Sequence, residues 1–270
     1  SMKCVNLVKK FARKYGTAKV CLYNLPYFGA AGIYSEMIAQ EKDLIGIVTC
    51  ITPGWMKPYC KDKSNAASKR IGTNPIAWST PYNHGIITID IATSQRAASV
   101  ALNAGKSNQG KERAEDMISV PSDYLIDLEG NEVVYPESPE YVRNCSLFPL
   151  GGKNFGYKGY GLSVSIELEH VAGGCENTDI IPGCKTSEGR VGQIFEAVSI
   201  DSVYDRETVL SKISNVVSNI LECGGGNAKL PGQIEQEYRN RHLKEGIPYS
   251  DAQVERLIKI GKCAGIQFDL

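Results

Sequence analysis

The sequence has no net charge, few histidines and no long apolar run. Its 270 residues carry 30 basic and 30 acidic side chains, so no overall field would draw the protein to nucleic acid or to an anionic membrane. No segment approaches the roughly 20 apolar residues that span a bilayer, and no charged-then-apolar leader opens the chain. We therefore expect a soluble, cytoplasmic protein that binds a small molecule and neither nucleic acid nor a membrane.

Metal and disulfide signatures are also missing. The nine cysteines include no CxxC pair, which is the spacing that zinc and redox sites favour. The three histidines, at 84, 170 and 242, are far apart in the chain. We expect reduced and mostly buried thiols, surface or structural histidines, and no metal site.

The usual nucleotide-binding fingerprints are absent as well. No GxxxxGK[ST] phosphate loop occurs, and the Gly-Tyr-Gly at 159–161 lacks the third glycine of the dinucleotide motif. That segment does not clearly follow a strand in a βαβ unit. These absences argue against a P-loop enzyme and against a Rossmann domain.

What is present is the periodicity of an α/β protein. The spacing of apolar residues predicts helices over 3–15, 30–38, 209–221 and 254–261, and strands over 19–25, 44–48, 75–80 and 85–91. Turn residues at 83–85 predict that the last two strands pair antiparallel, which argues against a pure βαβ sheet. Asp205 and Gly224 are placed to begin and end the third helix. The polar segment 103–116 predicts an exposed loop or a mobile lid, and 127–139 is turn-rich.

The segment GYKGYGLSVSIELEH, 156–170, gives conflicting signals. Its second half alternates apolar and polar residues, which by itself predicts a half-buried strand. The glycines before it favour a loop that opens a helix, where free backbone N–H groups meet an anion and Lys158 adds positive charge. A plain glycine turn with a solvated lysine is the commoner alternative.

Five stretches in order along the chain carry a family resemblance. They are YFGAAGIYSEMI at 27–38, GTNPIAWSTP at 72–81, IDIATS at 89–94, PLGG at 149–152 and YKGYGL at 157–162. Together they resemble the malate/L-lactate dehydrogenase family of the second type, which includes ureidoglycolate dehydrogenase, diketogulonate reductase and cyclic-imine reductases. Weaker similarity continues through GQIFEAVSID at 192–201 and LPGQ at 230–233, so the resemblance covers nearly the whole chain.

The resemblance implies an α/β fold with a mixed, largely antiparallel sheet flanked by helices, a non-Rossmann site for NAD or NADP, and a homodimer. It implies hydride transfer to or from a 2-oxo acid, a 2-hydroxy acid or a cyclic imine. We expect residues 18–200 to form the cofactor-binding domain. The helical portions, 1–17 and 201–270, would pack on it and complete the substrate side.

Residues of the matching motifs are carried over one by one. Tyr27 and Asp90 are the predicted catalytic residues. The predicted cofactor contacts are Thr52, Thr73, Asn74, Ile91, Ala92, Thr93, Ser94, Lys158, Gly159, Tyr160, Gly232 and Gln233. Two alternatives stay open, because Thr73 and Asn74 would also suit a turn before Pro75, and Thr93 or Ser94 would also suit a helix cap.

The chain departs from the family pattern at the predicted chemistry. Tyr27 stands where the family has a proton-transferring histidine, and a free tyrosine has a pKa of about 10 against about 6.5 for histidine. The family's Ser-His-Gly segment and following arginine have no counterpart before Met2. Three hypotheses follow: a reductase of altered chemistry, which we favour, a dinucleotide-binding sensor or partner subunit without catalysis, and an interaction protein on an old enzyme scaffold.

Overall fold

A five-stranded antiparallel sheet organises the molecule. The computed structural model describes residues 1–27, 29–59, 69–175 and 191–266. The strands follow the order β1-β7-β2-β3-β4, with bounds Thr17–Leu25, Val191–Ser199, Leu44–Ile51, Ile76–Tyr82 and Gly85–Ile91. Every pairing in this sheet is antiparallel, which confirms the predicted fold class.

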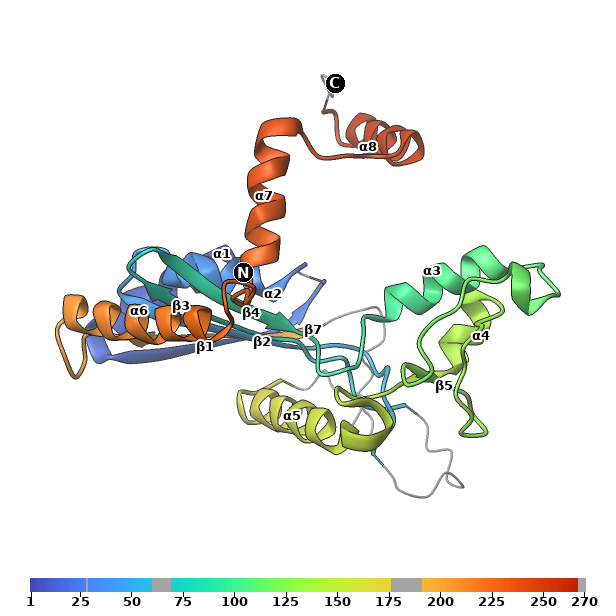
Figure 1. Cartoon of the computed structure of the whole chain (residues 1–270), viewed down its shortest axis with the longest axis horizontal. Helices are drawn as coiled ribbons and strands as arrows, with labels where there is room; N and C mark the ends of the chain where they lie inside the picture. Colours follow the sequence, from blue (N-terminus) through green and yellow to red (C-terminus); the bar gives the residue numbers. More distant parts are fainter. Residues whose placement is uncertain (28, 60–68, 176–190, 267–270) are drawn as a thin grey trace.

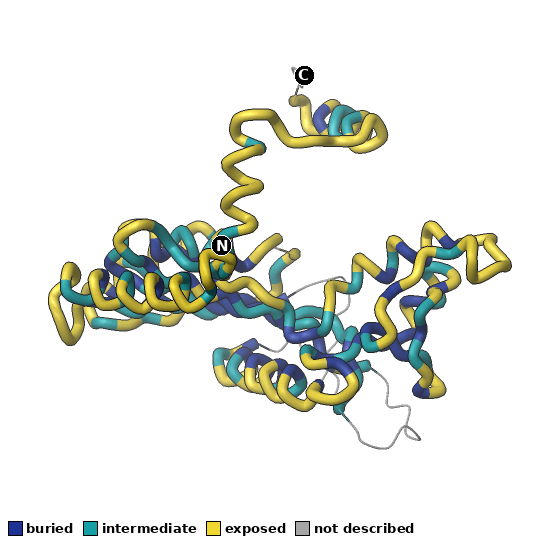
Figure 2. The backbone as a smooth tube through the Cα atoms, viewed as in Figure 1, coloured by how far each residue is buried: buried dark blue, intermediate teal, exposed yellow. Residues whose placement is uncertain are grey.

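Helices cover both faces of the sheet (Figure 1). Helices α1 (Met2–Tyr15) and α2 (Ala31–Ala39) lie on one face, and α5 (Gly152–Ala172) lies on the opposite face. Helix α6 (Arg206–Cys223) packs against β3. Helix α7 (Gln233–Glu245) projects from the sheet and leads to α8 (Asp251–Cys263), and Figure 2 shows both as mostly exposed.

Three apolar cores among the described residues hold the structure together. The first joins α1 and α2 to the sheet through residues such as Val8, Ile38 and Phe195. The second lies beside the sheet, among α3 (Ala98–Asn108), α4 (Pro139–Asn144), and the two-stranded sheet of β5 (Leu125–Ile126) and β6 (Ser146–Leu147); the short helix η1 (Ala114–Asp116) follows α3. The third, smaller core joins α5 to the sheet through Ile166 and Ile51. The site described below lies where the second core meets the end of the large sheet.

Local sequence signals explain most of the element boundaries. The four predicted helices and four predicted strands are all present, with ends shifted by a few residues. Helix α1 ends at Gly16, whose φ of 85° suits glycine. Asp205 accepts a hydrogen bond from the Thr208 amide at the start of α6, and Gly224 follows its last residue. The predicted hairpin forms through the pairing of β3 with β4.

The prediction of a loop or lid over 103–116 is wrong in its first half. Helix α3 continues to Asn108, and the side of it that carries Gly105 and Asn108 is buried. Asn108 donates hydrogen bonds to the carbonyls of Ile118 and Pro136, and a side chain at Gly105 would lie within 2.7 Å of the Ser138 backbone. These polar and small residues serve interior packing, which composition alone does not reveal.

The predictions for 156–170 are also corrected. Helix α5 runs through the glycines without interruption, so neither a loop at 156–161 nor a strand at 162–168 forms. The alternation does not follow burial, since Ile166 is buried and Leu168 is 64% exposed. Glycine costs about 1 kcal/mol relative to alanine inside a helix, but close packing outweighs this cost here. The preceding turn lies so close to the helix that only glycine fits at 159.

Three expectations drawn from composition concern membrane spans, metal sites and disulfides. Within the described ranges, no helix is long and apolar enough to cross a membrane, and no group of three or more His, Cys, Asp or Glu side chains is arranged to hold a metal ion. None of the seven described cysteines is in a disulfide bond, and four of them are buried. Cys60 and Cys184 lie outside the described residues.

Candidate functional site

Thr52, Thr73 and Asn74 form a hydrogen-bonded cluster at the end of β2 and the start of β3. The Thr73 amide donates to Thr52 Oγ1 at 2.9 Å, and the two threonine hydroxyls are 3.2 Å apart. The Thr52 amide donates to Asn74 Oδ1 at 3.1 Å. Both threonines are partly exposed residues. The three residues thus lie side by side, and their predicted contact with a cofactor stays a prediction.

Asn74 links this cluster to α5. Its side chain is fully buried, and Nδ2 donates to Ser163 Oγ at 3.0 Å and to Glu167 Oε1 at 3.0 Å. Its φ of 23° is a conformation that asparagine tolerates better than most residues. Because every polar atom of the side chain has a partner inside the protein, Asn74 positions the cluster. Its predicted contact with a cofactor stays a prediction.

Thr93 and Ser94 join the cluster from the end of β4. Thr93 donates to the Thr73 carbonyl through both its amide, at 2.9 Å, and its hydroxyl, at 3.0 Å. Neither residue caps a helix, because α3 begins later, after Ala97. The alternative interpretation as caps is therefore wrong for these two residues. The Thr93 side chain instead ties the end of β4 to the segment before β3, and Ser94 Oγ donates to the Arg96 carbonyl at 2.8 Å. The Thr93 carbonyl in turn accepts from the Leu150 amide at 2.8 Å.

Leu150 carries the connection to the glycine-rich part of α5. The Gly159 amide donates to the Leu150 carbonyl at 3.1 Å, and a Cβ at position 159 would lie 2.4 Å from the Leu150 nitrogen. Gly161, by contrast, is exposed, and a Cβ there would meet nothing within 4 Å. The bare backbone that faces open space is thus at Gly161, two residues beyond the predicted contact at Gly159.

Lys158 lies on the exposed side of α5. Its ammonium is 5.3 Å from the centre of the Phe155 ring and 5.9 Å from that of Tyr157. Among the described residues it makes no salt bridge, so its charge is not neutralised by a carboxylate there. Tyr160, two residues after Lys158, is half-buried against the second core. Lys158 and Gly161 are thus both exposed on α5, and no described contact joins either of them to the threonine cluster.

Asp90 and Tyr27 lie at the N-terminus of α2. Asp90 Oδ2 accepts a hydrogen bond from the Gly32 amide at 2.8 Å. Ala30 occupies the N-cap position of α2, and its side chain cannot accept a hydrogen bond. Asp90, on β4, instead accepts the hydrogen bond from the first turn of α2 and so acts as its cap. Desolvation raises the pKa of Asp90, and the Gly32 hydrogen bond opposes that rise. Tyr27, in the connection before α2, is 76% exposed.

The remaining predicted residues lie along the outer strand. Ile91 ends β4 and Ala92 follows it, adjoining the threonine cluster in the chain. Gly232 precedes α7 with a φ of 81°, and a Cβ there would lie 2.8 Å from the Thr88 carbonyl oxygen on β4. Gln233 accepts a hydrogen bond from the Leu230 amide and donates to Glu237. Gly232 therefore packs against β4, whereas the bonds of Gln233 stay within the start of α7.

Sequence reasoning missed three residues of this region. Ser163 and Glu167 bind Asn74 from α5, and Gly32 binds Asp90. No sequence signal marks any of the three, because Glu167 and Ser163 stand in a run that alternates apolar with polar residues and Gly32 lies within an apolar stretch. Only the structure shows that Glu167 is 3% exposed, and a charged residue is seldom so buried without a partner.

Known proteins of similar sequence and fold define the class of enzyme. The structure of the protein matches that of sulfolactate dehydrogenase from Methanocaldococcus jannaschii over 98% of this chain and 72% of that chain, with a TM-score of 0.76 and 25% sequence identity. The chain is similar to L-sulfolactate dehydrogenase of Methanothermobacter thermautotrophicus, at 26% identity over 99% of this chain and 72% of the relative. It is also similar to 2,3-diketo-L-gulonate reductase of Citrobacter koseri, at 26% identity over 93% of this chain and 70% of the relative. This class is the oxidoreductases.

The particular family follows from the match along the whole chain. The model of the malate/L-lactate dehydrogenase family matches residues 1–258, and the protein belongs to that family. The resemblance found in the five sequence motifs is thereby confirmed.

Proposed function

We propose that the protein transfers a hydride between NAD or NADP and a small 2-oxo acid, its 2-hydroxy acid, or a cyclic imine. The observation that carries the proposal is the family match over residues 1–258, together with the polar cluster that joins the motifs. The related enzymes named above are dehydrogenases and a reductase, which supports this reaction type.

The residues at the end of the sheet fit a dinucleotide. Thr52 and Thr73 offer hydroxyls that remain partly exposed, and Lys158 offers a cation without a carboxylate partner among the described residues. A phosphate-bearing ligand needs such donors, and the open backbone at Gly161 allows close approach. Asn74, Thr93, Ser94 and Gly159 support this surface from inside. Gly232 and Gln233 would bound it at the start of α7.

The bound dinucleotide would supply or accept the hydride, and the chain must then handle the proton. Tyr27 is the residue we assign to that step, since its hydroxyl is exposed and lies just before α2. In reduction it would donate its proton to the carbonyl oxygen or imine nitrogen of the substrate, and in oxidation it would take the proton back. Asp90 would hold α2, and with it the connection that carries Tyr27, in place through Gly32.

The broader arrangement is part of the same proposal. Residues 18–200 would form the cofactor-binding domain, the helical portions 1–17 and 201–270 would complete the substrate side, and two copies would form a homodimer. A cytoplasmic location is also part of the proposal.

The decisive experiment measures oxidation of NADH and of NADPH with a panel of 2-oxo acids and cyclic imines. We expect turnover with at least one substrate, and a loss of about 10²-fold or more in kcat for Tyr27→Phe with little change in cofactor affinity, because the variant removes only the proton donor. Tyr23→Phe is the matched control, since Tyr23 is an exposed tyrosine on the neighbouring strand β1.

Two results would contradict the proposal. Cofactor binding without turnover across the panel would favour the dinucleotide-binding sensor or partner subunit. Absence of NAD(P)H binding by calorimetry would remove both and leave an interaction protein.

A further inference from the structure

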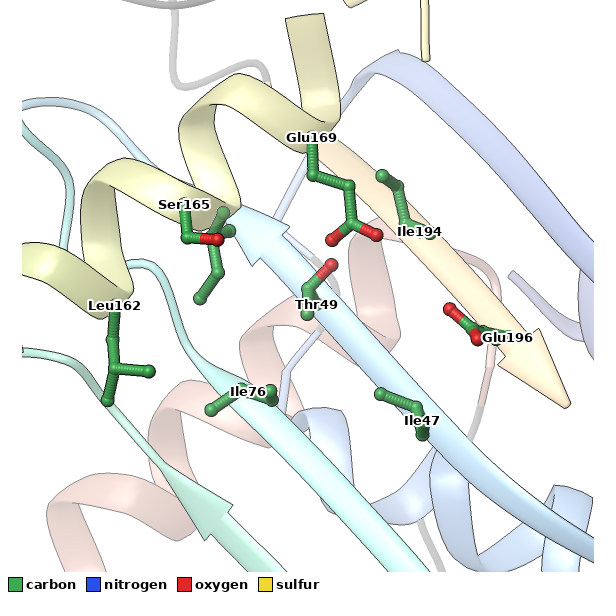
Figure 3. Close-up of a pocket in the computed structure, with 9 residues that line it drawn as sticks. Ile47, Thr49, Ile76, Leu162, Ser165, Glu169, Ile194 and Glu196 are labelled. Atoms are coloured by element: carbon green, nitrogen blue, oxygen red, sulfur yellow. The ribbon is translucent and has the colours of Figure 1, made fainter. Parts of the chain in front are cut away.

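A cavity lies between α5 and the face of the sheet that α5 covers, beyond the residues predicted to contact the dinucleotide. Its volume is about 210 Å³, and Figure 3 shows the side chains that line it. The lining consists of Ile47, Thr49, Ile76, Leu162, Ser165, Ile166, Glu169, Ile194 and Glu196. Aliphatic side chains thus form most of the wall, and the polar groups are two hydroxyls and two carboxylates.

Strand register explains why these residues converge. Thr49 on β2 is opposite Ile76 on β3 and opposite Ile194 on β7, so the three form one row across the sheet. In the neighbouring row Glu196 lies between Ile47 and Lys19. Residues two apart on a strand point to the same face, and both rows therefore face α5.

The floor of the cavity contains a polar atom without a partner. Thr49 is only 5% exposed, and its Oγ1 has no hydrogen-bond partner among the described residues. Figure 3 shows this hydroxyl directed toward the carboxylate of Glu169. A buried hydroxyl left unpaired costs roughly 1–3 kcal/mol, so a ligand that hydrogen-bonds to Thr49 would remove a real penalty.

The rim of the cavity carries more negative than positive charge. Lys19 forms salt bridges with both Glu169 and Glu196, the second at 3.0 Å. One ammonium therefore faces two carboxylates, which leaves one negative charge at the cavity. The three side chains are partly exposed, with Glu196 the most sheltered of them. A ligand can reach them from solvent, and the rim favours a cation.

We propose that this cavity is a binding site for a small amphipathic ammonium, a primary amine with a short aliphatic tail. The ammonium has three N–H donors, and Thr49 Oγ1, Glu169 and Glu196 supply three acceptors. The tail would lie among the isoleucines and Leu162, where burial of apolar surface is favourable. An inorganic cation lacks the tail and an alcohol lacks the charge, so neither matches both parts of the site.

The test uses 3-methylbutylammonium chloride as the probe, titrated into the full chain by calorimetry. The neutral isostere 3-methylbutan-1-ol and ammonium chloride serve as ligand controls at matched ionic strength. We expect saturable binding of the amine, with both controls at least about 10-fold weaker. Glu196→Gln should weaken the amine about 10-fold, because it cancels the excess negative charge.

Thr49→Val gives an independent readout. The variant keeps the shape of the side chain and removes its hydroxyl, so it should weaken amine binding several-fold while raising the thermal stability of the protein. Glu41→Gln is the matched control, because Glu41 pairs with Lys9 and Arg13 and does not line the cavity. It should bind the amine as the parent does.

The proposal is overturned if the amine does not bind, if the alcohol binds as tightly as the amine, or if Glu196→Gln and Thr49→Val both leave its affinity unchanged. None of these outcomes depends on cofactor binding or turnover. Failure of this site and failure of the proposed function are therefore separate results.

Discussion

Two glycines of one motif should respond in opposite ways to the same substitution. Gly159 and Gly161 both lie inside α5, two residues apart. A Cβ at 159 would lie 2.4 Å from the Leu150 nitrogen and 2.6 Å from its oxygen, and both atoms belong to the backbone and cannot rotate away. A Cβ at 161 would meet nothing within 4 Å. Gly159→Ala and Gly161→Ala therefore form a matched pair.

The magnitudes follow from packing and propensity. Alanine is favoured over glycine inside a helix by about 1 kcal/mol, so Gly161→Ala should stabilise the protein by roughly 0.5–1 kcal/mol. Gly159→Ala gains the same term, but overpacking costs about 1–3 kcal/mol and the hydrogen bond to Leu150 adds about 1 kcal/mol if lost. The two variants should differ by about 3 kcal/mol in free energy of unfolding.

Urea unfolding, followed by the fluorescence of Trp55 and Trp78, measures this difference. Equal stability of Gly159→Ala and Gly161→Ala would refute the argument that Leu150 makes glycine necessary at 159. The pair also bears on function. Because Gly161→Ala keeps the fold, a loss of NAD(P)H affinity in that variant would report direct approach of the dinucleotide to the backbone at 161.

Two further predictions concern buried polar groups. Asn74→Ala should lower the free energy of unfolding by about 3 kcal/mol, because it leaves the Thr52 amide and the Glu167 carboxylate without this partner. The control is Asn240→Ala at an exposed asparagine. In the same urea titration it should change the free energy of unfolding by less than about 0.5 kcal/mol. At Asp43, burial raises the carboxyl pKa but the hydrogen bond and charge of Arg13 outweigh it, so the net pKa lies below its ordinary value. A depressed folded-state pKa contributes stability above the unfolded value of about 3.9, and that stability is lost as the pH falls through the folded value. The stability advantage of the parent over Asp43→Asn should therefore shrink below about pH 4 in acid titrations, and an advantage independent of pH would contradict the assignment.

The sequence pattern predicted the helices and strands whose signals lie in neighbouring residues. The stripe over 209–221 predicts α6 because one apolar face at helical spacing needs no distant partner to be recognised, and Asp205 caps it within the same turn. The hairpin of β3 and β4 is equally local, since its turn residues lie between the strands. The motif order also sufficed for the family, which the match over residues 1–258 confirms.

Distant contacts decided the features that pattern misjudged. At 156–161 the glycines are typical of a loop, yet they lie in a helix because the Leu150 backbone packs against Gly159. Asn108 looks like a loop residue until its bonds to Ile118 and Pro136 are known. Asp90 caps α2 from a strand some 58 residues away in the chain. Each case depends on a partner that is not an adjacent residue, and the fold, not the local pattern, sets the position of that partner.

The sequence by itself determined four of the helices, four strands of the large sheet, the antiparallel pairing of β3 with β4, and the family, because periodicity, turn chemistry and ordered motifs are written in neighbouring residues. Only the tertiary structure decided which glycine is crowded and which is open, which threonine lacks a partner, and where one lysine faces two glutamates. Those features arise when segments far apart in the chain come within a few ångströms of each other, and their energies depend on that separation.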